Sequence, residues 1–181
     1  MNHPILPIYI QSLDLELPKK YLYDHVIEQH EKHKYNPIVG LGNSFKIKDT
    51  KENHFDRLYD EVLKKANNLF GELKLLENNS RNCLAYVTNK NHYRNGIHHH
   101  SKSSVINSVF YLHMPKTEKL KEGSLSFYDD SGEIELFWYK PKIGDLIFFP
   151  HYMKHEPNPI LTEEYRICIN IEIQCENVWN N

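Results

Sequence analysis

Three consecutive histidines, His98 to His100, lie just before a stretch of residues that is typical of a β-strand. In an extended segment, side chains two positions apart point to the same face, so His98 and His100 can converge on one ion while His99 points away. Histidine is the commonest protein ligand for metals, and we therefore expect a metal site. A third ligand must come from elsewhere, and His155, which closely follows an apolar strand-like run, is the best candidate.

These histidines also have a purely structural interpretation. A triple histidine in a solvated loop can bind metal adventitiously, and His151 and His155 can be hydrogen-bonded core or surface residues. The histidines of an earlier charged helical stretch are expected to lie on a solvated face; they are His25, His30 and His33.

Arg166 follows His155 by 11 residues and begins an otherwise apolar strand-like run. An arginine that faces the interior of a small barrel requires an anion, and a carboxylate can satisfy it with two parallel hydrogen bonds. An outward-facing Arg166 would instead be a solvated strand residue. The spacing leaves both orientations open.

Short runs rich in β-branched and aromatic residues dominate the chain after residue 80, with turn signals between them. The expected strands are Cys83–Thr88, Val105–His113, Ser124–Tyr128, Glu133–Tyr139, Asp145–Phe149 and Tyr165–Gln174. Such strands predict a jelly roll or barrel instead of alternating strands and helices.

The first 80 residues are expected to supply an edge strand and two helices. Pro7 restricts the apolar run Ile5–Ile10 to a sheet edge, and Pro18 suits the first position of a charged helix. Apolar side chains at three- and four-residue steps predict a second helix from Phe55 to Leu76. Lys34–Thr50 is expected to form a loop or short irregular strands.

The expected fold class is therefore mainly β (α+β), in a single domain over residues 1–181. Residues 1–80 form its N-terminal strand and helices, and residues 81–181 form a jelly-roll core that carries the metal site.

Composition excludes several classes of function. Lys and Arg number 22 against 24 Asp and Glu, so no basic excess exists to neutralise the phosphates of a nucleic acid. No apolar run reaches the roughly 20 residues of a membrane helix, and the N-terminal residues do not resemble a signal peptide. The three cysteines form no Cys-x-x-Cys motif, which favours buried thiols and a cytoplasmic location.

The order of these motifs resembles the 2-oxoglutarate/Fe(II)-dependent oxygenases. From about residue 84 to residue 174 the chain contains His-x-His, a strand ending Phe-Tyr-Leu, Gly-x-Leu-x-Phe-Tyr, Pro-x-x-Gly-Asp-Leu-Ile-Phe-Phe-Pro, a histidine and then an arginine. The chain is most similar to bacterial and phage members with a His-x-His motif, and more distantly to prolyl hydroxylase-like enzymes. The resemblance implies a double-stranded β-helix with N-terminal helices packed on it.

The resemblance implies that His98, His100 and His155 bind Fe(II), and that Arg166 binds the distal carboxylate of the cosubstrate 2-oxoglutarate. Tyr111 matches a tyrosine that helps to hold this carboxylate, although it can equally be an aromatic residue packed in a β core. Such enzymes use O2 to convert 2-oxoglutarate into succinate and CO2 while they oxidise a substrate, usually by hydroxylation. A peptide or protein, a free amino acid and a nucleobase all remain open as the primary substrate.

The chain departs from the wider superfamily in its metal ligands. The usual facial triad has two histidines and one carboxylate, whereas this site is all-imidazole unless Asp129 or Asp130 joins it. An apparent extra residue also leaves open which two of His98, His99 and His100 bind the metal.

The missing carboxylate motivates an alternative, a cupin-like module that holds Zn(II) or Ni(II) without oxygenase turnover. A third hypothesis is a non-catalytic structural or interaction domain with no specific metal.

Overall fold

The computed structural model describes residues 6–14, 19–33, 44–47, 53–81, 83–91, 96–100 and 105–179. In these residues the elements are β1 (Tyr9–Ser12), α1 (Lys19–His33), β2 (Ser44–Lys46), α2 (His54–Phe70), β3 (Cys83–Thr88), β4 (Val105–His113), β5 (Leu125–Tyr128), β6 (Glu135–Tyr139), β7 (Asp145–Pro150), β8 (His155–Pro157) and β9 (Arg166–Gln174).

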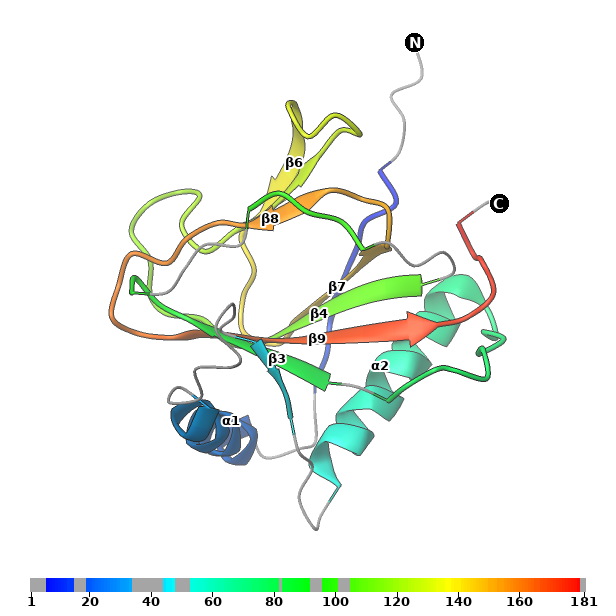
Figure 1. The fold of residues 1–181 in the computed structure, drawn as a ribbon, viewed down its shortest axis with the longest axis horizontal. Helices are drawn as coiled ribbons and strands as arrows, with labels where there is room; N and C mark the ends of the chain where they lie inside the picture. Colours follow the sequence, from blue (N-terminus) through cyan, green and yellow to red (C-terminus); the bar gives the residue numbers. More distant parts are fainter. Residues whose placement is uncertain are drawn as a thin grey trace.

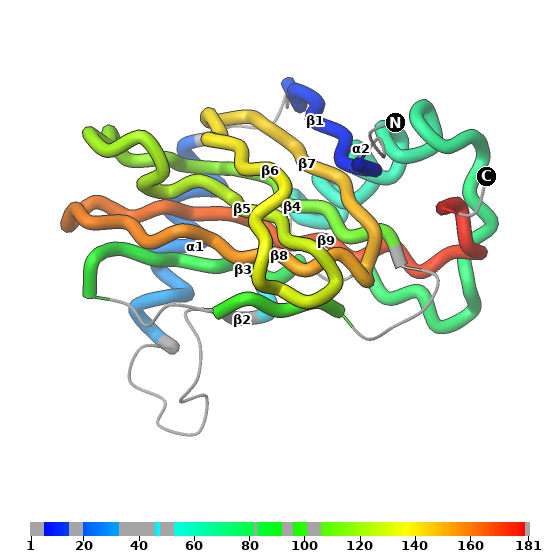
Figure 2. The backbone as a smooth tube through the Cα atoms, turned by 90° about the horizontal axis from the view of Figure 1, so that it is seen from above, coloured from blue at the N-terminus to red at the C-terminus, as the bar shows by residue number. Residues whose placement is uncertain are grey.

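Two antiparallel sheets face each other, and the two helices cover the outer face of the larger sheet (Figure 1). The larger sheet has the order β1-β7-β4-β9-β3-β2, and the smaller sheet has the order β6-β5-β8. Seen from above, the smaller sheet lies over β4 and β9 (Figure 2). The prediction of a mainly β jelly roll with N-terminal helices is confirmed.

Strand β9 shows why the two faces of the larger sheet differ. Its isoleucines, Ile167, Ile169, Ile171 and Ile173, belong to the apolar core shared with the helices. Successive side chains of a strand point to opposite faces, so the residues that alternate with the isoleucines face the smaller sheet. These residues are Arg166, Cys168, Asn170 and Glu172. The inner face of β9 is therefore more polar than its outer face, which suits contact with a polar ligand between the sheets.

Most strands occur where the sequence predicts them. The bounds of β3 and β4 agree with the prediction, and β1 pairs only with β7 at the edge of the larger sheet. Sequence analysis missed β8, a three-residue strand whose charged and proline residues lack the expected composition. Cys83 and Cys168 are buried free thiols, as their strand-like surroundings predict, and Cys175 is also buried and free. Pro18 and most of Lys34–Thr50 lie outside the described residues.

Helix α2 ends earlier than its apolar pattern predicts. It buries Phe55, Leu58 and Val62 against the larger sheet but stops at Phe70, not at Leu76. Gly71 follows with a φ of 85°, a positive φ that glycine adopts at little cost and that ends the helix. The chain beyond it is extended, and Leu73 remains buried there, so the apolar spacing continues after the helix has ended.

The prediction of a solvated histidine face on α1 is wrong for His30. Leu22 and Val26 are buried on this helix, and His30 lies on the same stripe, one turn further on. Only 5% of His30 is exposed, and its ring packs edge-on against Tyr165 at 5.6 Å. His25 is half-buried, while the side chain of His33 lies outside the described residues. Neither described helix is long and apolar enough to cross a membrane.

The core between helices and sheet predicts a clear contrast between two leucine variants. Leu146 of β7 is fully buried, whereas Leu120 is 72% exposed. Leu146→Ala leaves a cavity and should lower the free energy of unfolding by about 2–5 kcal/mol. Leu120→Ala should change it by less than about 0.5 kcal/mol. Chemical denaturation measures both values, and equal losses would contradict the assigned core.

Candidate metal centre and adjoining cavity

The backbones of His98 and His155 join as an isolated antiparallel bridge. The amide of His98 donates to the carbonyl oxygen of His155 at 3.1 Å, and the amide of His155 donates to the carbonyl oxygen of His98 at 2.9 Å. The amide of His100 also donates to the carbonyl oxygen of His151 at 2.8 Å. The histidine segment thus continues the smaller sheet beyond β8, and this pairing brings the predicted ligands together.

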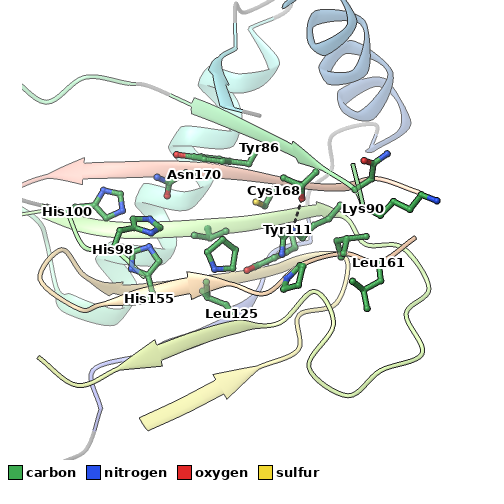
Figure 3. A pocket seen from close by; sticks show the side chains of 17 residues that line it. Tyr86, Lys90, His98, His100, Tyr111, Leu125, His155, Leu161, Cys168 and Asn170 are labelled. Carbon is green, nitrogen blue, oxygen red and sulfur yellow. Dashed lines mark hydrogen bonds between the residues drawn. The ribbon is translucent and has the colours of Figure 1, made fainter. Parts of the chain in front are cut away.

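The side chains of His98, His100 and His155 form one cluster (Figure 3). Each offers one ring nitrogen, and these nitrogens all lie within 4.8 Å of one another. His99 is exposed, and its Nδ1 lies 3.3 Å from the carbonyl oxygen of His100, outside the cluster. Of the two-residue choices within the triple histidine, the geometry therefore favours His98 and His100.

In each ring of the cluster, Nδ1 contacts an oxygen acceptor, and Nε2 is therefore available to bind a metal. Nδ1 of His98 lies 2.8 Å from the carbonyl oxygen of Gly96, and Nδ1 of His155 lies 2.9 Å from that of Met153. Nδ1 of His100 lies 2.9 Å from a carboxylate oxygen of Glu172. Nitrogens that contact these acceptors carry the proton, so Nε2 keeps its lone pair, as a metal ligand must. The donor set therefore fits a divalent transition metal.

His155 is the most enclosed of the three histidines. It is buried, and the ring of Phe149 packs against it with 4.7 Å between centroids. Burial, together with the neighbouring His98, lowers the pKa of His155 to about 3. The imidazole is consequently neutral near pH 7, the state that coordinates a metal.

Neither aspartate considered from the sequence joins this cluster. The carboxylate of Asp129 closes the turn before β6, where its Oδ1 accepts the amides of Gly132, Glu133 and Ile134. Asp130 is exposed. Among the described residues, the grouped metal-binding donors are all imidazoles.

A cavity of about 150 Å³ adjoins the histidine cluster between the two sheets (Figure 3). It is smaller than the 300–1,000 Å³ typical of sites for drug-sized ligands, and so it suits a small metabolite. Its lining consists of Tyr86, Thr88, Asn89, Lys90, His98, His100, Val109, Tyr111, Leu125, His155, Pro157, Pro159, Ile160, Leu161, Arg166, Cys168 and Asn170. The cavity thus contacts both the histidines and the predicted anion-binding arginine.

Arg166 faces the interior and is only 5% exposed. Its Nε donates to the hydroxyl of Thr88 at 3.1 Å, and its Nη1 donates to the carbonyl oxygen of Asn158 at 2.9 Å. Both acceptors are uncharged, so these contacts orient the guanidinium without neutralising it. Sequence analysis missed Thr88 and Asn158, because only the pairing of β3 with β9 sets Thr88 opposite Arg166.

Tyr111 lies between the two sheets, beside the cavity. It packs in the apolar cluster between the sheets, and it also lines the cavity. Burial raises the pKa of its phenol well above the usual range. The hydroxyl therefore remains protonated and can donate a hydrogen bond to an anion in the cavity.

The sequence of the core matches a known family. Residues 84–172 match the family model described as "Putative 2OG-Fe(II) oxygenase". The chain belongs to the 2-oxoglutarate/Fe(II)-dependent oxygenases, a family of oxidoreductases whose metal is Fe(II) and whose cosubstrates are 2-oxoglutarate and O2. No curated protein matches the chain in sequence.

Solved structures of this class share the fold at low sequence identity. A viral collagen prolyl hydroxylase from Paramecium bursaria Chlorella virus-1 is 13% identical, with a TM-score of 0.60 over 98% of this chain and 95% of that chain. A Trichoplax adhaerens prolyl hydroxylase in complex with a hypoxia inducible factor peptide fragment is 12% identical, with a TM-score of 0.64 over 93% and 83%. HygX from Streptomyces hygroscopicus, with nickel and 2-oxoglutarate bound, is 12% identical, with a TM-score of 0.58 over 93% and 83%.

The cluster predicts that His155 and His99 respond differently to the same substitution. His155→Ala removes an enclosed candidate ligand and should abolish stoichiometric binding of Fe(II) or Co(II) near neutral pH. His99→Ala removes an adjacent exposed histidine and should leave binding within about twofold of wild type. Anaerobic titration of the metal-free proteins measures both affinities. Unchanged binding in His155→Ala would exclude this residue as a ligand.

Proposed function

We propose that His98, His100 and His155 hold Fe(II), and that Arg166 and Tyr111 hold the distal carboxylate of 2-oxoglutarate in a hydroxylating dioxygenase. The observation that carries this assignment is one cavity that contacts both a triple-imidazole cluster and a buried guanidinium whose hydrogen-bond partners, among the described residues, are neutral. A small molecule that is both a metal chelator and a carboxylate fits these two features.

Arg166 and its partners bind and orient the cosubstrate. Thr88 and the backbone of Asn158 fix the guanidinium, so that its remaining donors can take a carboxylate with little further loss of side-chain freedom. The phenol of Tyr111 supplies a neutral donor beside it. Burial of these groups lowers the local dielectric and strengthens their attraction for an anion.

Fe(II), when bound, supplies the redox chemistry by which O2 converts 2-oxoglutarate into succinate and CO2 with oxidation of the substrate. The chain's part is to fix the ligands and to keep water from the reacting groups. Val109, Leu125 and Ile160 form apolar parts of the cavity wall, and the buried His155 closes one end. Backbone pairing of the histidine segment with His155 and His151 positions the three imidazoles.

A peptide or protein side chain is the proposed class of primary substrate. Two of the compared structures are prolyl hydroxylases, and one of them contains a peptide fragment. The net charge of −2 offers no comparable support for nucleic acid. We also propose a cytoplasmic location, since the three cysteines are buried free thiols, and a single domain over residues 1–181 in which the helices support the sheet that carries the site.

The cupin-like alternative, a Zn(II) or Ni(II) module without turnover, rests on the all-imidazole donor set. It differs from the oxygenase in one measurable respect, because a module without turnover forms no succinate.

Succinate formation tests the reaction without knowledge of the primary substrate. Purified protein with Fe(II), ascorbate, 2-oxoglutarate and O2 should release succinate, because these enzymes turn over slowly in the absence of substrate. Omission of Fe(II), or its replacement by Zn(II), should abolish the product. Tight zinc binding with no succinate under any of these conditions would favour the cupin-like module.

Arg166→Ala should raise the KM for 2-oxoglutarate at least tenfold, since it removes a buried charge-assisted contact, and should leave metal affinity within about twofold. Tyr111→Phe removes one neutral donor and should have a smaller effect of the same sign. Arg81→Ala is the matched control, because Arg81 pairs with Asp56 and Asp60 near the surface. An unchanged KM in Arg166→Ala would remove Arg166 from the cosubstrate site.

A further inference from the structure

Glu172 places a carboxylate against one ring of the histidine cluster, on the side of the ring away from the proposed metal. One of its carboxylate oxygens lies 2.9 Å from Nδ1 of His100, at the normal distance of a charge-assisted hydrogen bond. The side chains are 27% and 20% exposed, so the contact is largely shielded from water. Residue types alone give no signal for this pairing, because Glu172 lies 72 positions after His100.

The register of the larger sheet explains why Glu172 reaches the site. On β9 it follows Arg166, Cys168 and Asn170 on the same face, and these four residues alternate with core isoleucines. The strand therefore carries, on one inner face, the arginine of the cosubstrate end and the carboxylate of the histidine end. Slippage of β9 by one residue would turn both away from the site.

Asn107 adds a second polar side chain beside Glu172. It lies directly opposite Glu172 in the pairing of β4 with β9, and on the same face of β4 as Val109 and Tyr111. It is fully buried, and neither its amide nitrogen nor its amide oxygen has a hydrogen-bond partner among the described residues. Burial of an unpaired amide is costly. Asn107 and Glu172 together therefore make this end of the inner face polar, although an apolar side chain at position 107 would avoid that cost.

We propose that Glu172 is the carboxylate of this metal centre, acting through His100 in place of a carboxylate bound to the metal itself. This inference rests on the proposed function of the site. Glu172 is a positioning residue: it holds the proton on Nδ1 of His100, fixes the ring and directs Nε2 to the metal. Its negative charge lies one ligand away from the ion and makes the imidazole a stronger donor.

The same contact accounts for an oxygenase site without the usual aspartate or glutamate ligand. Three neutral imidazoles do not reduce the charge of a divalent ion. A carboxylate hydrogen-bonded to one of these rings places a negative charge close to the ion and so partly balances it. Neither Asp129 nor Asp130 is in the cluster, whereas Glu172 supplies a carboxylate that contacts one of its rings.

The test compares three glutamate variants by metal affinity. In Glu172→Gln, the amide oxygen can still accept a hydrogen bond from Nδ1–H of His100, but the negative charge is lost. Glu172→Ala removes the acceptor as well as the charge. Co(II) and Fe(II) dissociation constants of the metal-free full chain should rise about 10–100-fold, more in Glu172→Ala than in Glu172→Gln. Glu176→Gln, whose glutamate pairs with Lys74 on the surface, is the matched control and should bind as wild type does.

Melting temperatures of the metal-free proteins separate positioning from a structural role. Weaker metal binding with an unchanged melting temperature supports the proposal. Metal affinity within twofold of wild type in both Glu172 variants overturns it, as does a loss of affinity that accompanies a lowered melting temperature. If wild type forms succinate while the Glu172 variants bind metal normally, only the role of Glu172 fails. If wild type binds no Fe(II), the proposed function fails with it.

Discussion

The reciprocal backbone hydrogen bonds between His98 and His155 are the constraint on which the site depends. They attach a short extended segment to β8 and so bring three imidazoles around one point. Nothing in the side chains themselves would assemble this cluster, because three imidazoles in close proximity do not attract one another. The binding site is therefore preorganised by β pairing, and the cost of bringing the ligands together is met during folding.

The two features of the cavity differ in electrostatic character. The histidines offer neutral nitrogen lone pairs, with the carboxylate of Glu172 behind one ring, whereas Arg166 presents a buried positive charge oriented by neutral oxygens. A dicarboxylate with a keto group can chelate a cation at one end and meet the guanidinium at the other. Both features depend on β9, whose inner face carries Arg166 and Glu172 while its isoleucines anchor it in the core below.

Local patterns made much of this architecture predictable. The β-branched and aromatic composition of β3, β4 and β9 predicts strands, and the spacing of His98 and His100 predicts a shared face. Long-range pairing was not predictable: β8 has no strand-like composition, and only the register of β9 against β3 and β4 reveals Thr88 and Glu172. His30 was misassigned because a polar residue on a charged helix can still lie on its buried stripe. The end of α2 was misplaced because apolar spacing continues in the extended chain after Gly71.

The central claim is that one cavity binds Fe(II) and 2-oxoglutarate together, with the metal on His98, His100 and His155. Anaerobic visible spectroscopy of the Fe(II)-loaded protein tests it most directly, because chelation of Fe(II) by a 2-oxo acid gives a weak charge-transfer band. Addition of 2-oxoglutarate should produce this band in wild type and fail to do so in His155→Ala. A wild-type protein that holds stoichiometric Fe(II) and shows no band at saturating 2-oxoglutarate would contradict the account.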